Sequence, residues 1–269
     1  MSNTPIGIFD SGMGGLTVLR ALMARLPQES FIYLGDTARL PYGTKSADTV
    51  RRYALQASRT LVARNVKMVV VACNTASVSL PALQQAMAPL PVLGVIAPGA
   101  QAAVAAAPHG PIAVIATEGT VKNGAYRAAI RAHAADMTIV QQACPLFVPM
   151  TEEGLIDGPI AEAIAHRYLD PLLMTIPAPK CLLLGCTHYP VLKPMIARLA
   201  GAHIALVDSA ATTAEAAARL LDDHGLAHRG AASAPRFLAT DAPDRFARVG
   251  QIFLGSAIDP GQVEPVDLQ

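Results

Sequence analysis

Blocks of like charge are missing from this sequence, and charged residues of any kind are few. The 269 residues include 21 Lys or Arg and 20 Asp or Glu, which gives a net charge of +1 at pH 7. Nucleic acids and anionic membrane surfaces attract proteins through basic patches, and this balance supplies none. With 52% hydrophobic and 15% charged residues, the composition predicts a compact globular protein without a nucleic-acid partner.

Long apolar segments are also lacking. No stretch of 18 apolar residues occurs, and the alanine-rich run around 100–107 contains Gln101 and ends at Pro108. The chain does not begin with basic residues followed by an apolar run, because a strand-like segment starts at Ile6 and runs into Asp10. We therefore expect no membrane association and a cytoplasmic location.

The four cysteines include no C-x-x-C pair. In a reducing compartment this argues against a disulfide framework and leaves thiol chemistry, metal binding or simple burial. A zinc site built from Cys73, Cys186 and His188 would have neither C-x-x-C nor H-x-x-x-H spacing. We therefore predict no metal site.

The segment KCLLLGCTHYP at residues 180–190 carries the most information. Its apolar part is too short for an isolated helix and is bounded by glycine and proline, which predicts a buried strand of a parallel sheet. Cys186 follows directly, at the carboxyl end of that strand, where open α/β sheets bind their ligands. A thiol, a hydroxyl and an imidazole occupy consecutive positions there.

The same design occurs earlier in the chain. Residues 67–83 align without a gap on residues 180–196, and the alignment places Cys73 on Cys186. In both segments an apolar strand ends in a small residue, a cysteine and two polar residues. We interpret this as an internal duplication.

Strand and helix patterns alternate along the whole chain. Strands are expected at Ile6–Phe9, Phe31–Leu34, Met68–Ala72, Val92–Ile96, Ile112–Ala116, Thr138–Val140, Cys181–Leu184, Ile204–Val207 and Arg236–Ala239. Helices are expected at 16–26, 46–64, 124–135, 159–170, 212–224 and 243–253. This alternation predicts an α/β protein with two doubly wound lobes of similar fold, each with a mainly parallel sheet. A pseudo-two-fold would relate the lobes and place the active site in the cleft between them.

Two lobe crossings are predicted, near residues 97 and 208. Residues 1–97 and 209–269 would form the first lobe, and residues 98–208 the second. The connectors would be 97–99 and 208–212, and a capping box from Thr212 to Glu215 would start the helix after the second crossing.

If a rough two-fold axis relates the lobes, the cysteine at the strand end of each would approach the cleft from opposite sides. Inverting a carbon centre requires a base on one face and a proton donor on the other, which Cys73 and Cys186 would supply. Each precedes a helix, whose amino terminus favours a thiolate. Cys144 and Cys181 lie in apolar surroundings and are expected to be structural.

Other polar residues lie in loops at the same strand ends. The glycine-rich turn after Asp10 and Ser11 could hold an anion such as a carboxylate on its amides. The long loop after the second strand contains Asp36, Tyr42 and Gly43, where turn chemistry is the alternative to ligand binding. Next to the thiols lie further candidates for substrate contacts, namely Asn74, Thr75, Thr187 and His188. His188 could also act as the acid–base partner of Cys186.

Four blocks in this sequence, IGIFDSGMGGLTVL, YLGDTARLPYGTKS, VVACNTAS and LLLGCTHYP, resemble those of bacterial glutamate racemases and occur in the same order. These enzymes belong to the wider family of cofactor-independent aspartate/glutamate racemases. The resemblance spans nearly the whole chain. It implies interconversion of L- and D-glutamate for peptidoglycan biosynthesis, without cofactor, by a protein that is expected to be a homodimer.

The resemblance also implies residue roles. The catalytic residues would be Cys73, Cys186, Asp10, His188 and Glu152, with Cys73 serving D-glutamate, Cys186 serving L-glutamate and Glu152 supporting His188. The substrate-binding residues would be Asp10, Ser11, Tyr42, Gly43, Asn74, Thr75, Thr117, Thr187 and His188. Thr117 is included although the neighbouring Asn123 departs from the serine usual in the family.

Three alternatives compete with this interpretation. A hydrolase or transferase would need only Cys186 and His188, and would leave the second cysteine block unexplained. A racemase or decarboxylase for another small dicarboxylate would share both thiols. A two-lobed solute-binding protein would share the architecture and leave its ligand unchanged.

Overall fold

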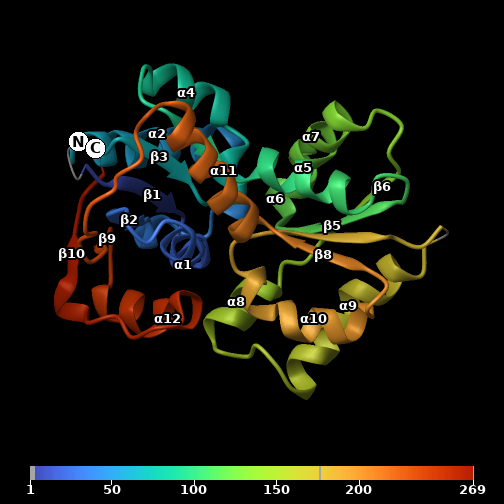
Figure 1. Ribbon diagram of the computed structural model, residues 1–269. Helices are drawn as coiled ribbons and strands as arrows, with labels where there is room; N and C mark the ends of the chain where they lie inside the picture. The colour runs from blue at the N-terminus through green and yellow to red at the C-terminus, as the bar shows by residue number, and fades with distance from the viewer. Residues whose placement is uncertain (1–3, 176, 269) are drawn as a thin grey trace.

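The computed structural model describes residues 4–175 and 177–268, which form two parallel sheets with flanking helices (Figure 1). The first sheet has the strand order β10-β9-β2-β1-β3-β4, and every neighbouring pair is parallel. Its strands are β1 (Ile6–Asp10), β2 (Phe31–Gly35), β3 (Met68–Val71), β4 (Val92–Gly94), β9 (Arg236–Ala239) and β10 (Val263–Pro265).

The second sheet repeats the arrangement of the first. Its order is β6-β5-β7-β8, again all parallel, which matches β2-β1-β3-β4 strand for strand. The strands are β5 (Ile112–Ala116), β6 (Ile139–Ala143), β7 (Cys181–Gly185) and β8 (Ala205–Asp208). The predicted α/β fold with two similar, parallel-sheet lobes is confirmed, and the two strands that precede the paired cysteines, β3 and β7, hold the same place in their sheets.

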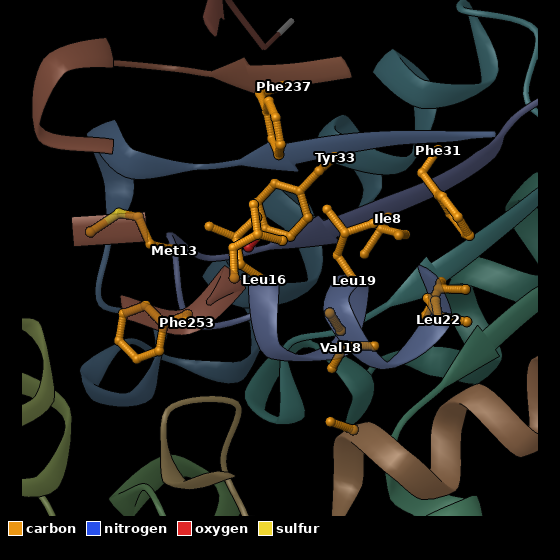
Figure 2. Close-up of a cluster of buried hydrophobic side chains, with 14 of the residues drawn as sticks. Ile8, Met13, Leu16, Val18, Leu19, Leu22, Phe31, Tyr33, Phe237 and Phe253 are labelled. Atoms are coloured by element: carbon orange, nitrogen blue, oxygen red, sulfur yellow. The ribbon is translucent and has the colours of Figure 1, made fainter. Parts of the chain in front are cut away.

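Helices cover both faces of each sheet, so both faces are apolar. Alternate strand residues therefore enter different hydrophobic clusters: Ile8 and Phe9 of β1 face opposite sides, as do Ala113 and Val114 of β5. Figure 2 shows one of these clusters, to which Tyr33 of β2 and Leu16 and Leu19 of the helix after β1 belong. Burial on both faces explains the nearly continuous apolar runs of the strands.

The helices of the first sheet's lobe are α1 (Leu16–Arg25), α2 (Ala47–Val62), α3 (Asn74–Ser77), α4 (Leu80–Met87), α11 (Ser209–Asp223) and α12 (Pro243–Leu254). Those that accompany the second sheet are α5 (Ile96–Ala106), α6 (Glu118–Asn123), α7 (Ala125–His133), α8 (Phe147–Glu152), α9 (Pro159–Leu173) and α10 (Lys193–Ala200). Short 3₁₀ turns are η1 (Thr37–Arg39), η2 (Tyr42–Thr44), η3 (Tyr189–Leu192) and η4 (Pro260–Gln262). Within residues 4–175 and 177–268, no helix has the length and apolar character needed to cross a membrane.

The two segments expected to be connectors lie almost entirely in helices. Residues 97–99 are inside α5, which begins at Ile96, because proline at position 98 is tolerated in a first helical turn. Residues 209–212 of the second segment lie in α11, which packs against both α1 and α5. Helices α5 and α11 therefore join the two halves of the molecule directly.

The capping box predicted at Thr212 is wrong. Helix α11 begins at Ser209, and the side chain of Asp208 caps it by accepting a hydrogen bond from the amide of Ala211 at 2.9 Å. The hydroxyl of Thr212 instead donates to the backbone oxygen of Asp208 at 3.1 Å. A carboxylate at the end of β8 reaches the free amides of the helix start before the threonine can.

Candidate active site

A cavity of about 120 Å³ lies between the two sheets, at the carboxyl ends of their strands. One water needs roughly 10–15 Å³ by the same measure, so the cavity has room for a small molecule. Most of the predicted site residues line it: Ser11, Tyr42, Gly43, Cys73, Asn74, Thr75, Thr117, Glu152, Cys186, Thr187 and His188. Asp10 and Asp36 do not line it, and both are fully buried.

Cys73 lies between β3 and the short helix α3, for which it is the N-cap residue. Its thiol donates to the hydroxyl oxygen of Ser11, with 3.7 Å between Sγ and Oγ. Burial raises the pKa of Cys73, and the neighbouring Asp10 carboxylate raises it further, while the amides of Ser11 and Ala76 work in the opposite direction. Together these effects favour the protonated thiol at this position.

Cys186 follows β7 and has a different partner. Its Sγ lies 3.9 Å from Nδ1 of His188. Nε2 of His188 lies 3.1 Å from a carboxylate oxygen of Glu152. Burial lowers the pKa of His188, but its contacts with Cys186 and Glu152 outweigh this effect and raise that pKa to about 10. The imidazole is therefore positively charged at neutral pH and can donate a proton to the thiolate form of Cys186.

Glu152 is at the end of α8 and is held from two sides. Oε1 faces His188, and Oε2 accepts a hydrogen bond from Arg245 of α12 at 2.8 Å. Burial tends to raise the pKa of Glu152, but the two cationic neighbours lower it overall. Glu152 thus contacts His188 directly, and the contact of Arg245 with Glu152 was not predicted.

The glycine-rich loop after β1 differs from the predicted anion cradle. The amides of Gly12 and Gly15 both donate to Oδ2 of Asp10, each at 3.1 Å. Those two donors are therefore engaged by the chain's own carboxylate. Burial raises the pKa of Asp10, partly offset by the charge of His188 and by these amides.

The same loop lies against the second lobe. A Cβ atom added to Gly14 would lie 2.7 Å from Oγ1 of Thr187 and closer still to the ring of His188. The hydroxyl of Thr17 donates to the backbone oxygen of Thr187 at 2.8 Å. Only glycine permits this approach, so the glycine at position 14 serves packing between the lobes.

The loop after β2 forms another part of the wall. The hydroxyl of Tyr42 donates to Oδ2 of Asp36, which also accepts from Nε of Arg39 at 2.7 Å. Gly43 lies against Thr117, because a Cβ added to it would be 3.0 Å from Cβ of Thr117. Asp36 is fully buried and anchors Tyr42 in the cavity wall.

Three threonine hydroxyls meet across the cleft. Oγ1 of Thr75, from the first lobe, lies 3.0 Å from Oγ1 of Thr117 and 3.3 Å from Oγ1 of Thr120. Nearby, the side-chain amide of Asn74 donates to the hydroxyl of Tyr126 at 2.7 Å. Among the described residues Oδ1 of Asn74 has no hydrogen-bond partner, so a bound ligand could donate to it.

Thr120, Tyr126, Arg245 and Phe253 contact residues of this site and were not predicted. Phe253 of α12 packs edge-on against His188, with 4.9 Å between ring centroids and an interplanar angle of 72°. The other thiols, Cys144 and Cys181, are buried and do not line the cavity. In the part of the chain that the structure describes, no group of three or more His, Cys, Asp or Glu residues could hold a metal ion.

Comparisons with known proteins agree on one family. The model for Asp/Glu/Hydantoin racemases matches residues 16–217. A glutamate racemase from Geobacter metallireducens is 47% identical over 98% of this chain and 97% of its own length.

Solved structures give the same result. A glutamate racemase from Francisella tularensis, crystallised in complex with D-glutamate, is 36% identical, with a TM-score of 0.91 and coverage of 100% of this chain and 99% of its own. A glutamate racemase from Thermus thermophilus, in complex with beta-chloro-D-alanine, is 42% identical, with a TM-score of 0.87 and coverage of 99% and 98%.

Proposed function

Because this chain belongs to the Asp/Glu/Hydantoin racemase family, we propose that it interconverts L- and D-glutamate with two cysteines as the acid–base pair. The substrate follows from relatives that are glutamate racemases over almost their full length. One observation supports the two-cysteine reaction most directly. Cys73 and Cys186 line the same cavity, and they follow equivalent strands of two similar sheets.

Each turnover is one proton removal and one proton return at Cα. One cysteine, as thiolate, takes the Cα proton, and the electron pair of the broken C–H bond is delocalised into the substrate's α-carboxylate. The other cysteine, as thiol, then gives its proton to the opposite face of the carbon. The number of protons on the protein is unchanged, but the two thiols have exchanged roles.

The two thiols have different local support. His188 lies beside Cys186 and is protonated at neutral pH, so it can compensate a thiolate or return a proton to it. Cys73 has the hydroxyl of Ser11 and two amides. We assign L-glutamate to Cys186 and D-glutamate to Cys73, as in the family that the chain resembles.

Polar groups around the cavity suit an amino acid with two carboxylates. Hydroxyls and amides of Ser11, Thr75, Thr117 and Thr187 are potential donors to carboxylate oxygens. Oδ1 of Asn74 is buried without a protein donor, and an unpaired buried acceptor is costly. The substrate's ammonium group would satisfy it.

The wider role follows from the same proposal. Production of D-glutamate would supply peptidoglycan biosynthesis in the cytoplasm, without metal, nucleotide or pyridoxal phosphate, and the protein would act as a homodimer.

Proton NMR of L-glutamate with purified protein in deuterium oxide, without added cofactor, tests the reaction. We expect the Cα proton signal to disappear while D-glutamate accumulates. A ligand that stays chemically unchanged and keeps its Cα proton would favour a solute-binding protein. A stable acyl adduct on Cys186 would favour a Cys–His hydrolase.

A further inference from the structure

Arg245 is outside the cavity but is connected to its chemistry through two residues. Its guanidinium lies 2.8 Å from Oε2 of Glu152, whose other oxygen lies 3.1 Å from Nε2 of His188. Nδ1 of His188 in turn lies 3.9 Å from Sγ of Cys186. Arg245 does not line the cavity, and its direct contact with the residues of the site is the one with Glu152.

This contact is made between elements that are distant in the sequence. Glu152 is on α8, whereas Arg245 is on α12, which packs against α1 and β10 of the first sheet's lobe. Figure 1 shows α12 beside α8. The same helix contributes Phe253, whose ring packs against His188. Helix α12 therefore supports both members of the Glu152–His188 pair from the opposite lobe.

We propose that Arg245 is a positioning residue for proton transfer at Cys186, which it serves by holding the Glu152 carboxylate against His188. The inference rests on the proposed racemisation for its effect on turnover, but the geometry that it claims can be measured separately. With Arg245 present, both oxygens of Glu152 are fixed by cationic donors. Without it, a carboxylate whose side chain is only 9% exposed keeps a single partner and is free to turn away.

Removing Arg245 should shift the pKa of His188 in a direction that depends on what Arg245 does. The charged or titratable groups around it are Cys186 of the β7 loop, Glu152 of α8, Asp10 of the β1 loop and, beyond Glu152, Arg245 of α12. If Glu152 is displaced, His188 loses an anion and its pKa falls toward the ordinary value. If Arg245 acts only as a positive charge while Glu152 stays in place, removing it raises the His188 pKa instead. The two roles therefore give opposite shifts.

The test compares Arg245→Met, Arg245→Lys and a matched control, Arg248→Met. Arg248 lies on the same helix, is exposed, and carries the same charge. NMR titration of the imidazole signals, with His188 assigned from a His188→Gln variant, gives its midpoint in each protein. We expect a fall of about one pH unit or more in Arg245→Met, recovery in Arg245→Lys, and no change in Arg248→Met. A midpoint that stays the same or rises in Arg245→Met overturns the proposal.

Turnover provides the second measurement. In Arg245→Met we expect kcat for glutamate to fall about tenfold with KM nearly unchanged, because a group that guides proton transfer is misplaced. In a Glu152→Gln background the same substitution should have no further effect on kcat or on the His188 midpoint. An equal loss in both backgrounds, or a loss matched by Arg248→Met, overturns the proposal. A wild-type protein that fails to racemise glutamate refutes the proposed function instead, and the titration still decides the role of Arg245.

Discussion

The backbone of Gly14 lies directly against the imidazole of His188, so close that no side chain fits between them. Gly14 belongs to the loop after β1, whereas His188 follows β7 of the other sheet. The ring beside Cys186 is thus held in part by the opposite lobe.

Replacing Gly14 with alanine should reduce activity much more than stability. The new methyl group would push His188 or Thr187 aside, and a misplacement of about 1 Å costs roughly 100-fold in rate. Steady-state kinetics with thermal unfolding would measure both effects. Gly99→Ala is the control, since a Cβ there meets nothing closer than 3.4 Å. A Gly14→Ala enzyme with wild-type kcat would show that the ring has room to move.

Cys73→Ser and Cys186→Ser should each abolish racemisation in both directions, because inversion needs both groups. Each variant keeps one working thiol, so each should exchange the Cα hydrogen of only one enantiomer with solvent. Cys73→Ser should exchange the Cα hydrogen of L-glutamate with solvent deuterium and return L-glutamate. Cys186→Ser should do this for D-glutamate only.

The controls for this pair are Cys144→Ser and Cys181→Ser. Both thiols are buried away from the cavity, so these variants should lose stability but racemise both enantiomers. Equal exchange of both enantiomers by either Cys73→Ser or Cys186→Ser would mean that one base serves both faces.

The free energy of unfolding should fall with rising pH above neutrality because of His188. Its pKa is raised to about 10 in the folded protein from 6.5. The stabilisation is therefore complete below pH 6.5 and is lost as the pH rises toward 10, at about 1.4 kcal/mol per pH unit for one proton. Urea unfolding at pH 7, 8 and 9 should show a smaller slope for His188→Gln than for wild type. Parallel slopes would show that His188 is not the group responsible.

Dialysis against a chelator, or treatment with hydroxylamine, should leave activity unchanged, because thiols and an imidazolium supply the proton transfers that racemisation needs. The measurement is the rate of racemisation before and after treatment. Activity restored only by zinc or by pyridoxal phosphate would contradict a reaction carried by thiols alone.

Aspartate should be a poor substrate. We expect the two carboxylates of glutamate to bind groups on opposite lobes, such as Thr75 and Thr187, so a chain one methylene shorter cannot reach both and misplaces its Cα. A loss of roughly 100-fold in kcat/KM is expected. Comparable turnover of the two amino acids would indicate a broader specificity.

Local patterns predicted the architecture well because strand–helix alternation and two matched cysteine segments leave few alternatives. They failed where the same residues fit two structures. Proline at position 98 suggested a connector but lies in the first turn of α5, and Thr212 suggested a cap that Asp208 provides.

Most polar residues of the cavity wall were predictable from motifs next to strand ends, with Asp10 and Asp36 fully buried outside the lining. Tyr126, Arg245 and Phe253 were not, because each lies on an amphipathic helix where it resembles any other residue of its type. Only the packing of helices from distant parts of the chain reveals their partners, and sequence periodicity carries no information about that.

Helices α5 and α11, which pack together where the chain crosses between the sheets, have a mechanical consequence. Cys73 and Cys186 are each attached to their own sheet through β3 and β7, so the gap between their sulfurs depends on the angle at which these helices hold the sheets. A substitution at the α5–α11 contact can therefore change the spacing of the two thiols although no residue of the cavity wall is altered.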